Sequence, residues 1–358
     1  MQVFRALLPW HPWRSVLVLR WLPQSAGQVV LASFRQASAK PRLGTRKSIN
    51  TESVTIPGLD DAEKIRENLR SVRKSLSIPD GEVIPVGVGF INWILDITEA
   101  LDEPLIHVAL AEKPKALWFA FGPNMGRHIQ SVRDYDAKRS DGHKTLVFAI
   151  VSSVEMALKA ANEWGVDVLV AQGIEAGGHG ATYAPPLFSL LPAILAAFPP
   201  GQGPLVIGAG GVSTGAQVAA LLTLGASGAA VGTRFLFTPE SIYTDDMKAE
   251  LVKADFGATA RGMMFDEVMA VPGCNWPENH DGRALSNEIV TDSQKGLSLD
   301  ERQRLFNEAT TKGEVGRTVM WAGVGVGLTK EIKPAAEVVM ELHTDTIKSL
   351  MATPKISS

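Results

Sequence analysis

Two glycine loops, each directly after a short apolar run, constrain the fold of this chain more than any other feature. Leu205–Ile207 leads into the loop Gly208-Ala-Gly-Gly-Val. Ala229–Val231 leads into Gly232-Thr233. Short apolar runs bounded by glycine are typical of buried parallel strands. Each loop is therefore expected at the carboxyl end of a strand.

The segment between these two strands has the pattern of a helix. Ser213 and Thr214 are plausible N-caps. Apolar side chains recur at helical spacing over residues 216–222, and Gly225 stops the pattern. Backbone N–H groups in such loops can face an anion, and in a (β/α)₈ barrel the loops after strands seven and eight are the usual phosphate site. We expect a barrel that binds a phosphorylated ligand here; the alternative is that the glycines only make turns.

Upstream of the loops, apolar runs alternate with helical patterns at intervals of roughly 25–35 residues, which predicts βαβ units and a parallel sheet. Further strands are expected at Val83–Phe90, Ala116–Phe121, Thr145–Val151 and Val166–Ala171. Helices are expected at residues 60–77, 98–110, 125–131, 153–164 and 187–198, the second of them interrupted early by Pro104. The six strands are two short of a closed barrel. The missing pair would have to come from residues 1–56, where the pattern is poorest.

The first 51 residues differ in composition from the rest of the chain. They contain no Asp or Glu, eight Lys or Arg, and three of the eight tryptophans. An Arg-rich, acid-free, amphipathic segment is typical of a mitochondrial presequence. An untidy N-terminal extension or a wrongly translated first exon would have the same composition. We expect residues 1–51 to be an atypical extension or a presequence, and the protein to be cytoplasmic, or mitochondrial if this segment acts as a presequence.

The composition of the whole chain argues against several classes of protein. A net charge of −3 gives no electrostatic case for nucleic acid or an anionic membrane as a partner. The single cysteine, Cys274, excludes an internal disulfide and a cysteine-cluster metal site. No apolar run reaches the roughly 18 residues that a membrane span needs. We expect a soluble protein with no metal site, no nucleic-acid partner and no membrane partner.

Beyond Thr233 the alternation of strands and helices ends. Helices are expected at Asp245–Asp255 and Ser298–Thr311, with an irregular stretch between them. A last helix is expected at Ala335–Leu350. This pattern predicts a mainly helical excursion that covers one face of the barrel. The expected division of the chain is residues 1–51 as the extension, 52–240 as the barrel, 241–323 as a helical insertion or lid, and 324–358 as the C-terminal closure.

A third glycine-rich stretch, Gln172–Gly180, directly follows the predicted strand Val166–Ala171. Active sites of barrels form at this end of the strands. The stretch contains His179, the one histidine of seven with glycines on both sides in such a place. Its imidazole could take a proton from carbon or hold a developing negative charge near neutral pH. We predict that His179 is catalytic and that the other six histidines are surface or core residues.

Four further residues of this stretch carry expectations. Gln172 could donate to a flat heteroaromatic ring, and Gly177 and Gly178 would let such a ring approach the backbone. Glu175 is expected to cap or brace the loop rather than to act as a second acid–base group. The serine-hydrolase elbow, the zinc-protease motif and the nucleotide P-loop are all absent from the sequence.

Together these stretches resemble the nitronate monooxygenases, formerly called 2-nitropropane dioxygenases. The resemblance runs from about Val83 to Leu350. Its motifs are Gln172-Gly-x-Glu-Ala-Gly-Gly-His179, Ala209-Gly-Gly-Val, Gly232-Thr-Arg-Phe235, Trp276-Pro277, the Asp-Gly-Arg at 281–283, and Trp321-Ala-Gly-Val-Gly-Val-Gly327. It implies an FMN-containing TIM barrel with an added helical region.

The resemblance also implies a reaction and a set of contacts. His179 would be the catalytic histidine, as a base for neutral nitroalkanes or an electrostatic partner for nitronates. The nitronate would reduce the flavin by one electron before O₂ joins, and a carbonyl compound and nitrite would result. Gly89 would lie at the isoalloxazine edge, and Gly211 with residues 230–233 would hold the phosphate. The expected FMN contacts are Gly89, Gln172, Gly177, Gly178, Gly210, Gly211, Ala230, Val231, Gly232 and Thr233.

The N-terminus departs from the pattern of the family. Family members usually open with a strand that ends in a Pro-Met-x-Gly-like turn under the flavin, followed by a glycine-rich second strand. Neither is evident in residues 1–56, so these strands are expected to be atypical or missing. Missing strands would leave an open seam and remove one wall of the flavin pocket.

Two alternatives stay open: an enoyl-thioester reductase-like flavoenzyme that needs a nicotinamide donor, and a non-catalytic barrel that binds a phosphorylated metabolite. A homodimer is a further expectation.

Overall fold

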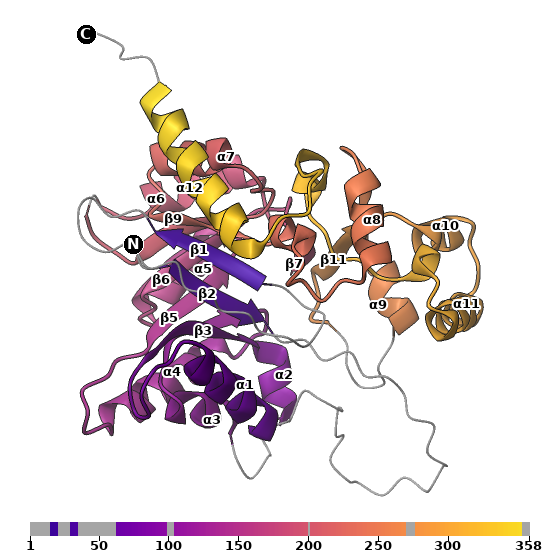
Figure 1. The fold of residues 1–358 in the computed structure, drawn as a ribbon. Helices are drawn as coiled ribbons and strands as arrows, with labels where there is room; N and C mark the ends of the chain where they lie inside the picture. Colours follow the sequence, from indigo (N-terminus) through magenta and orange to yellow (C-terminus); the bar gives the residue numbers. More distant parts are fainter. Residues whose placement is uncertain are drawn as a thin grey trace, which may run out of the picture.

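A closed eight-stranded barrel forms the centre of the computed structural model, which describes residues 15–20, 29–34, 62–98, 104–199, 201–269 and 276–352 (Figure 1). Its strands are β1 (Ser15–Arg20), β2 (Val29–Phe34), β3 (Ile84–Ile91), β4 (Pro114–Ala120), β5 (Leu146–Val151), β6 (Val168–Gln172), β8 (Leu205–Ala209) and β9 (Gly228–Val231), hydrogen-bonded in this order. The predicted (β/α)₈ barrel is confirmed. Each of the six strands expected from the apolar runs is present.

The two N-terminal strands are atypical in direction, but they are not missing. β2 runs parallel to β3, whereas β1 runs antiparallel to both of its neighbours, with Leu17 opposite Leu31 and Val231. Because both strands are present, the open seam that missing strands would leave does not arise. Both strands are short apolar runs rich in Val, which favour β-structure. Their signal was hidden by the Arg-rich, acid-free composition around them, which favoured a presequence instead.

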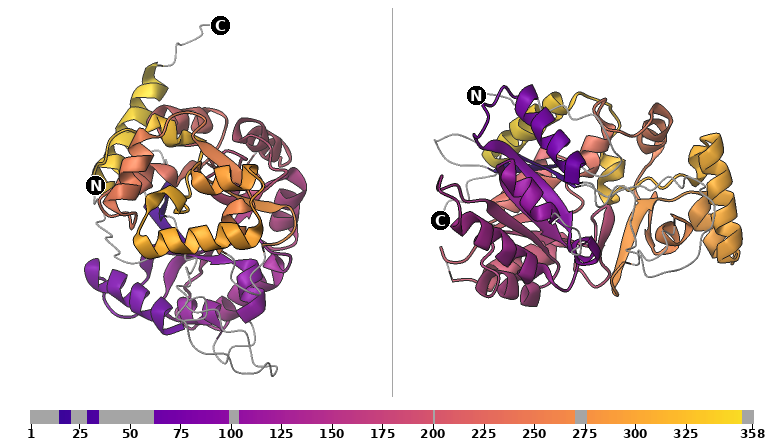
Figure 2. Two further views of the ribbon diagram at one scale, coloured as in Figure 1. Left: turned by 90° about the vertical axis from the view of Figure 1, so that its right-hand side faces the viewer. Right: turned by 90° about the horizontal axis from the view of Figure 1, so that it is seen from below.

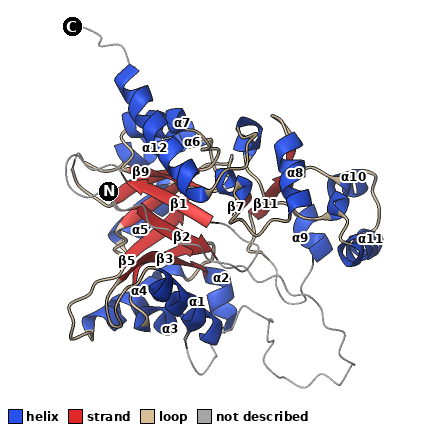
Figure 3. Ribbon diagram, in the orientation of Figure 1, coloured by secondary structure: helices blue, strands red, loops and turns tan. Residues whose placement is uncertain are grey.

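Helices cover the outside of the barrel (Figure 3). They are α1 (Ala62–Ser75), α2 (Asn92–Thr98), α3 (Leu105–Ala111), α4 (Met125–Ala137), α5 (Val154–Asn162), α6 (Leu187–Ala196), α7 (Gly215–Thr223) and α12 (Ala335–Ala352). Within the range 98–110, the structure has α3, which begins directly after Pro104 as the expected interruption indicated, while Thr98 is the last residue of α2. Proline lacks an N–H and has a fixed φ, so it fits the beginning of a helix better than its interior.

Side chains alternate between two cores along the barrel strands. In β4, Leu117 and Phe119 pack against the surrounding helices, while Trp118 belongs to the core inside the barrel. There Trp118 stacks on Phe148 of β5, with ring centroids 5.4 Å apart. All four side chains are buried, and full burial of a large apolar side chain contributes about 1.5–3 kcal/mol. Because side chains alternate in this way, Trp118 points into the barrel, where it lines a cavity.

A second, smaller sheet stands beside the barrel (Figure 2). It pairs β10 (Thr259–Gly262), β11 (His280–Leu285) and β7 (Gly178–Ala181) in antiparallel fashion. Around it lie η1 (Thr233–Phe237), α8 (Asp245–Lys253), α9 (Met264–Met269), α10 (Glu288–Gln294), α11 (Leu299–Lys312), η2 (Val315–Arg317) and η3 (Val324–Leu328). The helices expected near residues 245–255 and 298–311 are confirmed. The three strands were not predicted, because β7 reads Gly-His-Gly-Ala and lacks any apolar alternation.

The described ranges contain no helix that is both long and apolar enough to cross a membrane. Within the same ranges, no three His, Cys, Asp or Glu side chains converge where they could hold a metal ion. Cys274 lies outside the described residues.

Candidate active site

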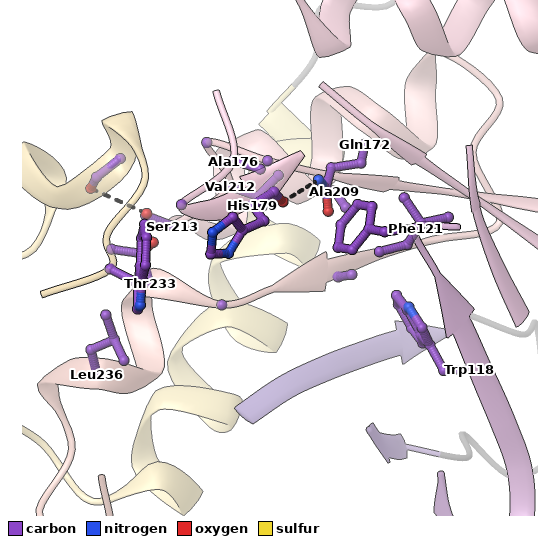
Figure 4. Close-up of a pocket in the computed structure, with 18 of the residues that line it drawn as sticks. Trp118, Phe121, Gln172, Ala176, His179, Ala209, Val212, Ser213, Thr233 and Leu236 are labelled. Atoms are coloured by element: carbon purple, nitrogen blue, oxygen red, sulfur yellow. Dashed lines mark hydrogen bonds between the residues drawn. The ribbon is translucent and has the colours of Figure 1, made fainter. Parts of the chain in front are cut away.

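A cavity that is open to solvent lies where the barrel strands end; its empty space, open solvent included, is about 1030 Å³. Residues at or just beyond the carboxyl ends of β3, β6, β8 and β9 line it on the barrel side. Residues of the second sheet and of the chain around it line the other side. Active sites of (β/α)₈ barrels form at this end. Figure 4 shows His179 and Gln172 beside the residues that follow β8 and β9.

Two glycine loops form one wall of the cavity. Gly210 and Gly211 have φ angles of +105° and +72°, a region that glycine adopts without strain. Gly232 also lines the cavity, and no atom lies within 4 Å of the position that a Cβ would take there. Among the described residues, no loop hydrogen bond is donated by the N–H of Gly211, Val212 or Gly232. Backbone N–H groups in glycine loops of this kind can bind an anion.

The loop after β8 is held in shape by the start of α7. Thr214 caps the helix in a capping box, in which its Oγ1 accepts from the N–H of Gln217 at 3.3 Å. Gln217 Oε1 accepts from the backbone N–H of Ser213, and Gln217 Nε2 donates to the carbonyl oxygen of Gly211 at 2.9 Å. Ser213 Oγ donates to the carbonyl oxygen of Gly325. The predicted cap at Thr214 is confirmed, while the Ser213 hydroxyl ties the loop to the chain near η3. Contacts within the protein thus preorganise the loop.

His179 lies on β7, where it pairs with Gly282 of β11 and is only 2% exposed. Its Nε2 is 2.8 Å from Oδ1 of Asp266 in α9. The Trp276 ring stacks on the imidazole, with centroids 3.6 Å apart and 9° between the planes, and the Trp321 ring lies 4.5 Å away. A Cβ on Gly282 would lie 2.1 Å from the Trp321 ring, so only glycine leaves room for that ring. The second sheet therefore fixes both the place and the plane of the imidazole.

Two arginines brace the backbone around His179 from the second sheet. Arg261 pairs with Asp281, and Arg261 and Arg283 together donate to the carbonyl oxygens of residues 174, 180 and 181. Burial lowers the pKa of the Arg283 guanidinium, and the positive charge of Arg261 nearby lowers it further. Neither arginine lines the cavity. They hold the glycine-rich stretch in place from behind.

Gln172 and Glu175 also hold this stretch. Gln172 lines the cavity, and its Nε2 donates to the carbonyl oxygen of His179 at 3.0 Å (Figure 4). Both carboxylate oxygens of Glu175 accept from the backbone N–H of Leu187, at 3.0 Å each, which anchors the first residue of α6. The predicted bracing role of Glu175 is confirmed. The amide of Gln172 helps to orient the predicted catalytic residue.

The structure brings most of the predicted site residues together. Those that line the cavity are Gln172, Gly177, His179, Gly210, Gly211, Ala230, Gly232 and Thr233. Gly89, Gly178 and Val231 do not line it. Gly89 lies in β3 opposite Trp118, and Gly178 pairs with Arg283 in the second sheet. Val231 packs in the core between strands and helices, because successive side chains of β9 point to opposite faces.

An aromatic wall of the cavity was missed from the sequence. Trp118 and Phe121 line it from the barrel, and Trp276 and Trp321 line it from the other side. Trp276 packs edge to face against Phe121, with centroids 5.5 Å apart. Both of these tryptophans stand in motifs that carried the family resemblance, but no local pattern indicated that they would meet at His179.

Two polar residues were missed as well. Asn92 directly follows Ile91, which lines the cavity, and it is completely buried. Both atoms of its amide lack a hydrogen-bond partner among the described residues. A polar residue at the carboxyl end of a predicted strand is a signal that could have found it. No local signal could have found Asp266, because it is 87 residues from His179 in the chain.

The sequence profile of the nitronate monooxygenase family matches residues 58–345. This chain belongs to the nitronate monooxygenase family. Nitronate monooxygenases are oxidoreductases that act on small molecules, and the family in general depends on flavin. The match covers the barrel from α1 onward, both glycine loops, the second sheet and most of α12.

Individual nitronate monooxygenases are similar over most of the chain. The nitronate monooxygenase of Neurospora crassa is 30% identical over 359 residues, which covers 93% of each chain. The nitronate monooxygenase npaC of Metarhizium robertsii is 34% identical and covers 72% of each chain. Among solved structures, nitroalkane oxidase from Streptomyces ansochromogenes matches with a TM-score of 0.63 at 22% identity, covering 83% of this chain and 88% of that one. FabK from Thermotoga maritima matches with a TM-score of 0.61 at 22% identity, covering 82% and 84%. These two structures share the fold.

Proposed function

We propose that this member of the family binds FMN and oxidises alkyl nitronates with O₂ to a carbonyl compound and nitrite. One observation carries the proposal: a single cavity contains both an anion cradle, with Gly211 and Gly232, and a buried histidine, His179. The cradle suits the phosphate of a cofactor, and the histidine suits proton transfer at carbon. Membership of the family supports this class of reaction.

The residues that are present fit FMN. Its phosphate would be held by the loops after β8 and β9, where the N–H groups of Gly211, Val212 and Gly232 donate no loop hydrogen bond within the described chain. Trp118 and Phe121 offer apolar surface to a flat ring. When bound, FMN supplies the redox group that accepts electrons from the substrate and passes them to O₂.

His179 has two roles, depending on the form of the substrate. With a neutral nitroalkane, its imidazole removes the proton from the carbon that bears the nitro group. With a preformed nitronate, its protonated form balances the negative charge. No Lys or Arg is among the described residues that line the cavity, so His179 is the group of that lining that can carry a positive charge. Because Trp276 and Trp321 cover the imidazole, the proton moves away from bulk water.

Oxygen uptake and nitrite release test the proposal. The FMN-loaded protein is given an alkyl nitronate, and separately an enoyl thioester with NADH or NADPH. We expect O₂ consumption and nitrite with the nitronate and no oxidation of the nicotinamide. Oxidation of NADH or NADPH by the enoyl thioester without nitrite would favour an enoyl-thioester reductase. A folded protein that takes up no FMN would favour a barrel that only binds a phosphorylated metabolite.

The cellular location, the oligomeric state and the division of the chain into units can each be tested directly. We propose the cytoplasm, or the mitochondrion if residues 1–51 act as a presequence, and a homodimer. Sequencing the N-terminus of the protein isolated from its cells tests the first, because a removed presequence would take part of this segment with it. Light scattering on a sizing column tests the second. Limited proteolysis tests whether residues 241–323 behave as a unit separate from the barrel.

A further inference from the structure

The contact between His179 and Asp266 joins the barrel cavity to α9 of the chain that follows it. Nε2 of His179 lies 2.8 Å from Oδ1 of Asp266. We propose that Asp266 is a positioning residue: it holds His179 in the tautomer that carries its proton on Nε2, so that Nδ1 is the nitrogen that accepts the substrate proton. The inference deepens the proposed function and rests on it for the identity of the substrate.

The surroundings of Asp266 support this role. Its side chain is 12% exposed, and Oδ2 is buried without a hydrogen-bond partner among the described residues. A carboxylate only accepts hydrogen bonds, so the hydrogen between the two groups belongs to Nε2 of the imidazole. In a neutral imidazole the lone pair is then on Nδ1. Once the imidazole has taken a second proton, the carboxylate stabilises its positive charge.

The ring is held so that this hydrogen bond sets its orientation. Trp276 stacks on one face of the His179 ring, with 9° between the planes, and Trp321 lies at 52° to it. Stacking therefore limits rotation about the Cβ–Cγ bond of His179 to two orientations related by a 180° flip, and the hydrogen bond to Asp266 selects the one in which Nε2 points toward α9. Asp266 itself is fixed by α9, in which Phe265 is fully buried and packs on Trp321.

The other charged groups near this helix form ion pairs or hydrogen bonds elsewhere. The next residue, Glu267, pairs with Arg302 of α11 at 2.7 Å. Arg261 of β10 pairs with Asp281 of β11, and the guanidinium of Arg283 donates to the backbone of residue 174. Asp266 is thus the carboxylate that the fold directs at the imidazole. Its neighbour Glu267 provides a matched control, because it carries the same charge on the same helix and faces α11.

The test compares Asp266→Asn with Glu267→Gln, each as the full-length, FMN-loaded protein. In Asp266→Asn the amide can donate to Nε2 and move the imidazole proton to Nδ1. We expect kcat for a neutral nitroalkane to fall by about 10²-fold, within the range of general-base effects. We expect KM to change little, and turnover of preformed nitronate to fall by less than about fivefold because no carbon proton is removed. Glu267→Gln is expected to match the unmodified protein on both substrates.

A spectroscopic readout does not depend on turnover. Nitrogen-15 NMR of histidine-labelled protein, with the His179 signals assigned through His179→Gln, distinguishes the two tautomers. We expect Nε2–H in the unmodified protein and in Glu267→Gln, and a shift toward Nδ1–H in Asp266→Asn. A dominant Nδ1–H form in the unmodified protein would overturn the proposal. So would nitroalkane turnover by Asp266→Asn within about threefold of the unmodified protein. If the protein fails to oxidise nitronates at all, the tautomer measurement still decides the role of Asp266.

Discussion

The two halves of the site are built in different ways. The proposed anion cradle uses backbone groups from two loops, Gly208–Val212 and Gly232-Thr233, which follow adjacent parallel strands. The histidine half uses the side chains of His179 in β7 and Asp266 in α9, which are 87 residues apart, and the rings of Trp276 and Trp321. The first half follows from local backbone conformation, and the second exists only when the second sheet has formed. Changes in one half should therefore affect cofactor binding, and changes in the other should affect turnover.

The largest effect is expected from removing the imidazole. His179→Ala should lower the turnover of neutral nitroalkane by about 10²–10⁴-fold, because the general base is lost. Steady-state kinetics with nitroalkane measures this loss. Flavin content should stay near that of the unmodified protein, because the cradle is untouched. Unchanged nitroalkane turnover would remove the catalytic role of His179, and a loss of flavin would mean that the two halves are not separable.

A smaller effect, on cofactor binding rather than on turnover, is expected from a change in the cradle. Gly211 has φ +72°, and a Cβ there would lie 3.1 Å from Cβ of Glu175. Gly211→Ala should raise the Kd for FMN by about 10–100-fold, a free-energy change of about 1.4–2.8 kcal/mol. Fluorescence titration with FMN measures it. Once the protein is saturated with FMN, kcat should recover.

Gly313 supplies the control for backbone strain. It has φ +73°, ends α11, and has no atom within 4 Å of a Cβ position. Gly313→Ala should destabilise the fold by about 1–2 kcal/mol, as left-handed conformation costs an alanine, and should leave the FMN affinity unchanged. Equal flavin affinity in Gly211→Ala and Gly313→Ala would contradict the assignment of the cradle.

The second sheet should be sensitive to one added methyl group. A Cβ on Gly282 would lie 2.1 Å from the Trp321 ring. Gly282→Ala should displace that ring, destabilise the fold by about 1–3 kcal/mol as overpacking does, and lower nitroalkane turnover by about tenfold through the shifted imidazole. Thermal unfolding and kinetics on the same preparation measure both. Full activity with the methyl group in place would show that the plane of the imidazole does not matter for turnover.

The smallest effect is expected at the far end of the barrel, outside both halves. Hydrogen bonds from Lys113 and from the backbone of His143 lower the pKa of the Asp141 carboxyl from 3.8 to about 2. Because this pKa is lower in the folded state than in the unfolded state, the contact stabilises the fold above pH 4 and its contribution is lost as the pH falls toward 2. In Asp141→Asn, the free energy of unfolding should fall slightly less between pH 4 and pH 2 than in the unmodified protein, as measured by urea unfolding across this range. Flavin affinity and turnover should not change.

The sequence predicted the parts of this molecule that depend on local pattern. The strand predicted at residues 205–207, its glycine loop and the Thr214 cap all lie within one short segment; the structure confirms each of them, with the strand two residues longer than predicted. His179 could be selected because glycines surround it after a predicted strand. Its partners could not, because Asp266 and Trp321 reach it only through the pairing of β7 with β11.

The N-terminal strands show how one signal can conceal another. Residues 15–20 and 29–34 are short apolar runs, yet the basic composition around them is that of a presequence. The antiparallel direction of β1 follows from its pairing with β9, which is about two hundred residues further along the chain and has no local signature. Closure of the barrel is a property of the whole sheet and cannot be read from either strand alone.

The measurement that tests the central claim most directly is the visible absorption spectrum of the purified protein, with the released cofactor identified by mass. If one cavity joins the cradle to His179 around a flavin, the protein is yellow and releases FMN, and Gly211→Ala is paler than Gly313→Ala. A folded, colourless protein that also fails to take up added FMN would contradict the account, because the cradle would then serve some other ligand.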